Sequence, residues 1–262
     1  MTVDIDRLSP IHPSLAAELR VAVFDQAGVG ESVDVRPAMS ADEAAADALA
    51  VGRVLLSERF TVVGISLGGA AATRLALSTP QAVIGLVLAC TFPSASMCVA
   101  SGVTDDLTDL TEGSVEAEVA RSFSTQFRLR CPEVFAAVVE LSASAVVCAD
   151  MGDSAIHLFL SHEGHALSDV SVPTTVVCGD RDRVFESANS IAIATAIPHA
   201  RLELIAGAGH ALCAEAPERL AEIIRQACRP TSLGRRLCAS PQRRGAFVCS
   251  RENLQTTLRE RT

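Results

Sequence analysis

Short apolar runs alternate with helical patterns along most of this chain. Five runs rich in β-branched and other apolar residues are predicted to be strands, at residues 21–24, 60–65, 83–89, 174–178 and 201–205. Between them, apolar side chains recur at a helical spacing, which predicts helices at residues 13–19, 41–57, 68–78, 187–196 and 216–226. This alternation predicts an α/β fold in which a mostly parallel sheet is flanked by helices.

The middle and the end of the chain depart from this pattern. Residues 92–170 contain short helical patterns, at 114–129 and 132–149, and no clear strand. We interpret this stretch as a helical cap inserted into a single α/β-hydrolase-sized domain of residues 1–228. The remaining residues, 229–262, are rich in arginine and have no periodicity, so they are predicted to be a poorly ordered tail.

Charge and cysteine content argue against several classes of function. The net charge is −9, but eight arginines and two glutamates after residue 228 give that end +6 and leave −15 for the rest. The negative charge of residues 1–228 disfavours binding to nucleic acid or to an anionic membrane. No apolar stretch of the sequence is long enough to span a bilayer. The nine cysteines follow no metal-binding spacing and indicate a reducing compartment. We therefore expect a cytoplasmic protein without nucleic-acid or membrane partners.

A candidate nucleophile follows the predicted strand 60–65, in Gly64-Ile65-Ser66-Leu67-Gly68. A β-branched run leads into this Gly-x-Ser-x-Gly and small residues follow it, which is the pattern of a nucleophile elbow. The serine backbone is strained at such a turn, and the glycines avoid collisions with the neighbouring strand and helix. Ser66 would then lie at a helix N-terminus, where backbone N–H groups stabilise a developing oxyanion.

Candidate partners for Ser66 follow two later strands. A nucleophilic serine needs a base, and the base needs an acid that orients it and holds its positive charge. In a strand–turn–helix fold of this kind they follow in the order Ser, acid, His. Asp180 and Asp182 come just after the strand 174–178, and His210 lies in a glycine-flanked loop after the next strand. The pattern by itself leaves either aspartate as the acid.

Together these motifs make the chain resemble α/β-hydrolase fold enzymes of the cap-bearing esterase and lactonase type. The resemblance covers about residues 20–228 and is carried by Asp25-x-x-Gly28-x-Gly30-x-Ser32, Gly64-x-Ser66-x-Gly68, Gly179-x-x-Asp182, and Gly209-His210 before Glu215-x-Pro217.

The resemblance implies a role for each candidate residue. Ser66 is the implied nucleophile, His210 the base and Asp182 the triad acid, with Asp180 as the alternative acid. The backbone N–H of Leu67 is implied as an oxyanion donor. Chemistry of this kind needs no cofactor, so none is expected.

The other histidines and a nearby cysteine are given structural roles. His157, His162 and His165 do not all fall on one helical face, and no cysteine or carboxylate pattern completes a metal site, so no metal is expected. Cys213 lies three residues after His210 and is interpreted as a packing residue.

One part of the expected sheet is missing from the sequence. Enzymes of this type have a strand between those predicted at 21–24 and 60–65, and its His-Gly loop supplies a second oxyanion donor. No His-Gly occurs here and only twenty residues precede Val21, so we expect an N-terminally truncated chain that lacks a central strand. There are two alternatives. The protein is a degenerate family member that has lost this strand, or a different N-terminal arrangement fills the place of the strand. Residues 245–249 have the composition of a strand, but we do not expect them to fill that place.

The sequence predicts a serine hydrolase that cleaves a small carboxylic ester or lactone through an acyl-enzyme. The apolar composition of the cap favours uncharged substrates. Loss of one oxyanion donor would cost about 10²–10³ in rate. Haloperoxidase-like or carbon–carbon bond hydrolase chemistry with the same residues remains open. A non-catalytic binding protein on a hydrolase scaffold is the alternative from a different class.

Overall fold

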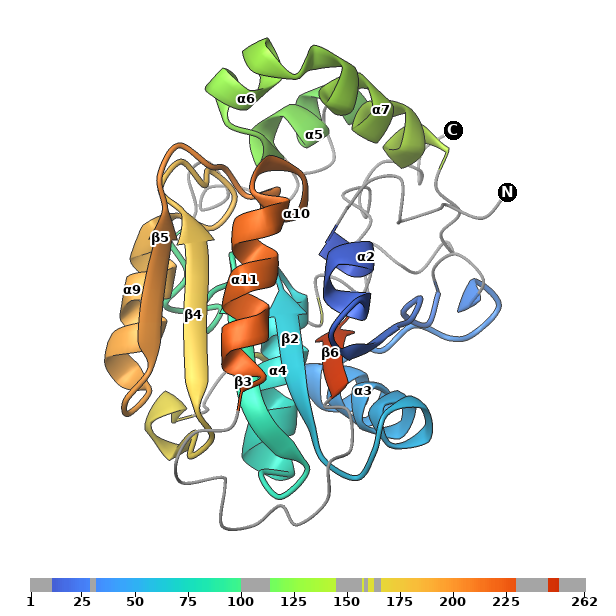
Figure 1. The fold of residues 1–262 in the computed structure, drawn as a ribbon, viewed down its shortest axis with the longest axis vertical. Coiled ribbons are helices and arrows are strands. Elements are labelled where there is room, and N and C mark those ends of the chain that lie inside the picture. Colours follow the sequence, from blue (N-terminus) through green and yellow to red (C-terminus); the bar gives the residue numbers. More distant parts are fainter. Residues whose placement is uncertain are drawn as a thin grey trace.

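Six parallel strands form one sheet in the computed structural model, which describes residues 11–28, 32–99, 114–144, 157, 160–162, 166–229 and 245–249. The strands are β1 (Arg20–Val23), β2 (Phe60–Ile65), β3 (Val83–Ala89), β4 (Thr174–Gly179), β5 (Arg201–Ile205) and β6 (Gly245–Cys249). Their order across the sheet is β1-β6-β2-β3-β4-β5, and each neighbouring pair is parallel (Figure 1). The predicted α/β class is confirmed.

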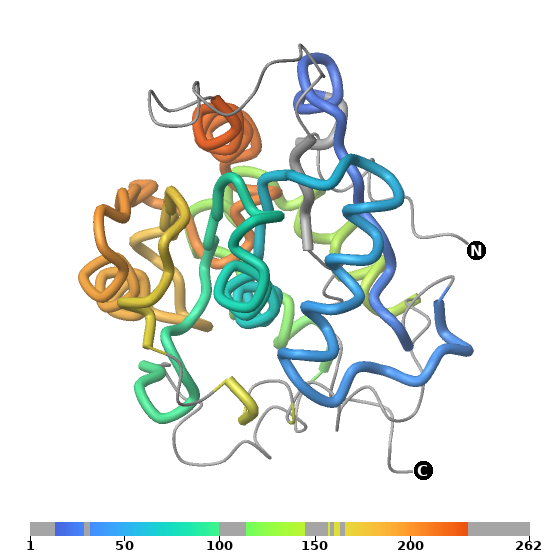
Figure 2. The backbone as a smooth tube through the Cα atoms, turned by 90° about the horizontal axis from the view of Figure 1, so that it is seen from below, coloured from blue at the N-terminus to red at the C-terminus, as the bar shows by residue number. Residues whose placement is uncertain are grey.

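Helices cover both faces of this sheet (Figure 2). The helices of the α/β core in the described residues are α2 (Ile11–Ala16), α3 (Ala41–Leu55), α4 (Gly68–Ser78), α9 (Ser187–Ala196), α10 (Leu212–Glu215) and α11 (Pro217–Ala227). Helices α3, α4 and α9 pack with Val62 and Leu86 on one face, while α2 and α11 pack with Val63 and Val87 on the other. Adjacent residues of β2 and β3 thus serve opposite faces, because side chains alternate along a strand. None of the helices in the described ranges is long and apolar enough to cross a membrane.

Helix α3 shows how local chemistry sets an element boundary. Ser40 is its N-cap, and the Ser40 hydroxyl accepts the backbone N–H of Glu43 at 3.2 Å. The Glu43 carboxylate in turn accepts the N–H of Met39 at 2.8 Å, and this bond holds the pKa of Glu43 below its usual value. Alanines line the buried face of α3, which lets it pack closely against α4.

In the cap predicted for residues 92–170, the described residues 114–144 are mainly helical. Helices α5 (Val115–Ser122), α6 (Thr125–Arg130) and α7 (Pro132–Ala143) lie above the carboxyl ends of the strands (Figure 1). They enclose an apolar cluster of their own, built around Phe123 and Phe127. A 3₁₀ turn, η3 (Leu167–Asp169), precedes β4 and returns the chain to the sheet.

The single cap helix predicted at 114–129 is wrong, because two helices occupy this stretch. Phe123 and Ser124 both have extended backbone, which ends α5. The Ser124 hydroxyl then accepts the N–H of Phe127 at 3.2 Å and begins α6 as its N-cap. Residues 145–149 of the second predicted cap helix lie outside the described residues.

Two further helix boundaries differ from the prediction. The helix expected at 13–19 ends at Ala16, where a turn leads directly into β1. The helix expected at 216–226 is preceded by α10, which the apolar pattern did not indicate. Ala216 separates α10 from α11 with φ −143°, since the residue before Pro217 is disfavoured in the helical region.

The position between β1 and β2 is occupied by β6, so the prediction that residues 245–249 do not fill it is wrong. β6 pairs in parallel with both neighbours; Ala246, for example, lies opposite Val21 and Thr61. An empty position would leave two rows of backbone N–H and C=O groups unpaired inside the sheet. The tail expected at 229–262 therefore contributes a central strand, while residues 230–244 and 250–262 lie outside the described residues.

A shortened chain tests whether β6 completes the sheet. A chain ending at Arg229 lacks β6, whereas a chain ending at Ser250 retains it and is the matched control. We expect the first to unfold at least about 10 °C below the full chain, because several ladder hydrogen bonds and a central strand are lost. The control should stay within about 2 °C of the full chain. Equal midpoints for the two shortened chains, measured by circular dichroism, would show that β6 does not stabilise the fold.

Candidate active site

Ser66 lies at the turn between β2 and α4. Its φ of +55° is in the left-handed region, which is strained for a residue other than glycine. The Ser66 N–H donates to the carbonyl of Ala89 at 2.9 Å, so the end of β3 holds this turn. A Cβ on Gly64 would lie 2.5 Å from the carbonyl oxygen of Gly68 and 2.6 Å from Cβ of Ala72. Glycine at position 64 thus lets the strand and the helix approach, as the elbow pattern predicts.

The loops after β4 and β5 are in close contact. A Cβ on Gly179 would lie 2.1 Å from the carbonyl oxygen of Ala208, so a side chain there would push the two loops apart. Gly207 has φ +77°, a conformation that glycine adopts without strain. This contact brings the loop that carries Asp182 beside the loop that carries His210.

His210 lies between Ser66 and Asp182. Nε2 of His210 is 3.0 Å from Oγ of Ser66, and Nδ1 is 2.9 Å from Oδ2 of Asp182. An ionised carboxylate only accepts hydrogen bonds, so we assign the proton to Nδ1, which leaves Nε2 to accept the Ser66 hydroxyl. The three residues are 5–8% exposed. In this geometry an imidazole can remove the proton of a serine hydroxyl.

The carboxylate of Asp182 is held rigidly. Its Oδ1 accepts the backbone N–H groups of Val184 at 2.9 Å and Phe185 at 3.0 Å, while Oδ2 faces His210. The Asp182 side chain has no exposed surface. The ring of Phe185 lies edge-on to His210, with 5.7 Å between the ring centroids. Backbone donors and an aromatic wall therefore fix the orientation of the acid and limit water around it.

Asp180, the alternative acid, lies at a different contact. Its Oδ1 accepts the N–H of Gly207 at 2.7 Å, and the residue is exposed. It thereby ties the turn after β5 to the end of β4. The structure brings Asp182, and not Asp180, into hydrogen-bond distance of His210.

Leu67, the implied oxyanion donor, is the N-cap residue of α4 and has helical dihedrals, φ −56° and ψ −30°. Backbone N–H groups at the start of a helix have no acceptor within that helix, which makes the Leu67 N–H a candidate donor to an oxyanion. The carboxyl end of β6 lies beside that of β2, with Cys249 opposite Gly64. The residues after Cys249 lie outside the described residues.

His162 and Cys213 pack in the apolar interior. His162 is 1% exposed, and its ring packs edge-on against Phe92 with 5.4 Å between centroids. His157 is exposed, and His165 lies outside the described residues. Cys213 packs against the core cluster beneath α11, as expected for a packing residue.

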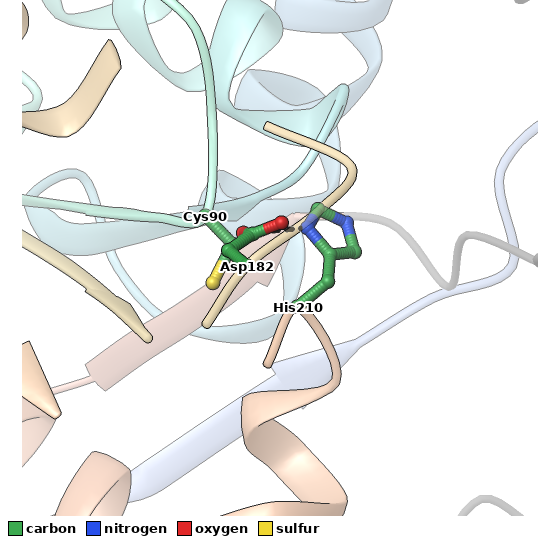
Figure 3. Close-up of side chains that lie close together, drawn as sticks. All are labelled: Cys90, Asp182 and His210. Carbon is green, nitrogen blue, oxygen red and sulfur yellow. Dashed lines mark hydrogen bonds and ion pairs between the residues drawn. The ribbon is translucent and has the colours of Figure 1, made fainter. Parts of the chain in front are cut away.

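Cys90, which no motif in the sequence marks, also borders the site. It directly follows β3 and is fully buried. One ligand-type atom from each of Cys90, Asp182 and His210 lies within 4.8 Å of the other two (Figure 3). Burial, and then the charge of Asp182, raises the pKa of the Cys90 thiol well above its usual value. Its place just after a buried strand, at the same sheet edge as Ser66, was the signal in the sequence.

Glu215 is the second residue whose role was missed. Its Oε1 accepts the N–H of Ser124 at 2.8 Å, and its Oε2 accepts the Ser124 hydroxyl at 2.6 Å. The N–H of Ala211 also donates to the carbonyl of Ser122 at 2.8 Å. These three bonds, which we call the cap clasp, join the α5–α6 junction to the residues just after His210. The Glu-x-Pro motif marked Glu215 in the sequence, but without a role.

Solved structures of several proteins share this fold. A thermophilic esterase from Thermogutta terrifontis is 24% identical, with a TM-score of 0.62 over 77% of this chain and 76% of that chain. An enol-lactonase from Burkholderia xenovorans LB400 is 20% identical, with a TM-score of 0.64 over 77% and 78%. A putative non-heme bromoperoxidase from Mycobacterium tuberculosis H37Rv is 19% identical, with a TM-score of 0.66 over 87% of each chain. At these identities the likeness shows the fold.

Sequence comparison adds the family. No curated protein matches the chain. The sequence profile described as the alpha/beta hydrolase family matches residues 4–223, which include the elbow and the loops carrying Asp182 and His210. The parallel sheet and the elbow turn agree with this match. The chain therefore belongs to the alpha/beta hydrolase family.

Proposed function

We propose that this chain is a serine hydrolase that cleaves a small carboxylic ester or lactone through an acyl-enzyme. The observation that carries the proposal is the buried hydrogen-bonded series from Ser66 through His210 to Asp182. The presence of an esterase and an enol-lactonase among the similar structures supports this substrate class. The apolar composition of residues 92–170 favours uncharged substrates.

The first half of the proposed reaction forms the acyl-enzyme. Nε2 of His210 takes the hydroxyl proton of Ser66 while Oγ attacks the carbonyl carbon of the substrate. The negative charge on the carbonyl oxygen is stabilised by the N–H of Leu67 and the N-terminal end of α4. When the tetrahedral intermediate collapses, the alcohol oxygen leaves with the proton from Nε2, and the acyl group stays on Ser66.

The second half of the reaction returns the free enzyme. His210 removes a proton from water as the water oxygen attacks the acyl carbon, and the bond to Ser66 Oγ breaks. Oγ regains a proton from Nε2, and the carboxylic acid leaves. Asp182 remains ionised in both halves, because it orients His210 through Nδ1 and stabilises the imidazolium.

Labelling with a fluorophosphonate tests the proposal directly. We expect the probe to react with Ser66 and with no other serine, since only an activated hydroxyl attacks the phosphorus atom quickly. Tryptic peptides mapped by mass spectrometry locate the adduct, and Ser66→Ala is the control that should abolish it. A chain that is folded by circular dichroism yet remains unlabelled would favour the non-catalytic alternative.

The two aspartates form a matched pair for a second test. Asp182→Asn should lower kcat for p-nitrophenyl butyrate by about 10⁴, because an amide cannot hold the required His210 tautomer. Asp180→Asn changes a neighbouring carboxylate that contacts Gly207 instead, and should lower kcat less than tenfold. Equal losses in the two variants would contradict the assignment of the acid.

The cap clasp predicts a link between the cap and the rate of the chemical step. Glu215→Gln keeps the size of the side chain but weakens both bonds to Ser124, so the His210 loop loses part of its support. We expect kcat to fall about tenfold, because small displacements of catalytic groups are costly. Ser124→Ala removes the hydroxyl bond to the same carboxylate and leaves the backbone N–H bond, so adding it to Glu215→Gln should lower kcat little further.

The matched control for the clasp is Glu218→Gln, an exposed carboxylate on α11 three residues away, which should leave kcat unchanged. Stopped-flow measurement of ester cleavage separates kcat from KM. If Glu215→Gln and Ser124→Ala lower kcat by independent factors that multiply in the double variant, the two residues do not act through one contact.

Haloperoxidase-like chemistry and carbon–carbon bond hydrolysis are the alternative reactions for Ser66, Asp182 and His210. A bromoperoxidase and a meta-cleavage product hydrolase are also among the similar structures. A panel of p-nitrophenyl esters, lactones, a carbon–carbon bond substrate, and bromide with peroxide separates these possibilities. Esters and lactones should be the faster substrates.

A further inference from the structure

Cys90 occupies a strained and fully buried position at the edge of the site. Its φ is +48°, in the left-handed region that a residue with a Cβ rarely adopts. Its backbone N–H donates to the carbonyl of Val177 at 2.9 Å, which joins the ends of β3 and β4. Glycine would adopt this conformation without strain. A cysteine at this position therefore points to a role for its thiol.

The thiol lies between the end of β4 and the acid of the site. Its sulfur is within 4.8 Å of a carboxylate oxygen of Asp182 and of a ring nitrogen of His210 (Figure 3). The Asp182 carboxylate and the backbone N–H of Gly179 are both close enough to act on the pKa of the thiol, which Asp182 raises and Gly179 lowers. Burial and the negative charge of Asp182 both raise the pKa of Cys90, so the thiol stays protonated and acts as a donor.

We propose that Cys90 is a positioning residue, whose thiol donates a hydrogen bond to the Asp182 carboxylate. This bond orients the carboxylate and reduces the stabilisation that its negative charge gives to the His210 imidazolium. The carboxylate already accepts two backbone N–H groups, from Val184 and Phe185, and faces Nδ1 of His210, so the thiol would be its fourth donor. This inference rests on the proposed role of His210 as the base.

Packing alone and metal ligation are the competing roles for Cys90. A filler role requires volume but no donor, so an alanine and a serine at this position would affect His210 alike. Metal ligation by Cys90, Asp182 and His210 would require a thiolate, which the buried setting disfavours. Among the described residues, the titratable groups near the thiol and the imidazole are Asp182 and Cys178 of β4.

The test is the pKa of His210, measured by NMR titration of protein labelled with ¹⁵N-histidine. In Cys90→Ala the carboxylate loses a donor, its charge acts more fully on the imidazolium, and the pKa of His210 should rise by about half a unit. Cys90→Ser retains a donor, so the pKa should equal that of the unchanged protein or lie below it. Cys228→Ala, which removes a buried thiol of the core, should leave the pKa unchanged.

Each outcome decides the proposal. An equal pKa in Cys90→Ala and the unchanged protein, or an equal shift in the alanine and serine variants, would overturn it. Stoichiometric uptake of Zn²⁺ that is lost in Cys90→Ala would overturn it in favour of a metal site. If Cys90→Ala does not fold, the NMR titration is replaced by infrared spectroscopy of the S–H stretching band. The band is assigned by the difference between the spectra of the unchanged protein and Cys90→Ser. A band displaced to lower wavenumber supports the donated bond, and a band at the position of a free thiol contradicts it.

The pH dependence of fluorophosphonate labelling is the functional readout. The acid limb of the labelling rate should move upward in Cys90→Ala by the same amount as the pKa of His210 and stay in place in Cys90→Ser. Absence of labelling at every pH would count against the proposed function, while the NMR titration would still decide the role of Cys90.

Discussion

The parallel pairing of the strands is the constraint on which the rest of this structure depends. Because β2, β3, β4 and β5 run in the same direction, their carboxyl ends meet at one edge of the sheet. Ser66, Cys90, Asp182 and His210 each follow one of these four strands. Ser66 and His210 are 144 positions apart in the sequence, yet the sheet brings them within hydrogen-bond distance. The close loop contact at Gly179 completes the arrangement.

Continuity of the same sheet explains why a segment near position 245 belongs to the fold. The backbones of β1 and β2 both need a partner on their facing edges, since unpaired peptide groups inside a sheet are costly. β6 satisfies both edges in parallel. Its carboxyl end lies beside that of β2, so the strand also borders the edge of the sheet where Ser66 lies. The α/β domain therefore extends beyond residue 228.

Sequence patterns predicted the elements that local forces decide. Strands β2, β3 and β5 and helices α4 and α9 have the predicted bounds, because apolar runs, glycines and prolines act over a few residues. The elbow at Ser66 was found for the same reason. The place of β6 was not, since strand pairing is a long-range choice and residues 245–249 carry no mark of their partners. The contact of Cys90 with Asp182 depends on side chains from two strands, which no local pattern encodes.

The most direct measurement of the central claim is to trap the covalent intermediate. The chain would be mixed with p-nitrophenyl butyrate, quenched in acid within milliseconds, digested and analysed by mass spectrometry. We predict a butyryl group on the peptide that contains Ser66, formed during the burst of p-nitrophenol release and lost as water completes the turnover. Turnover of the ester without an adduct on Ser66, or with an adduct on another residue, would contradict the role of Ser66 as the nucleophile.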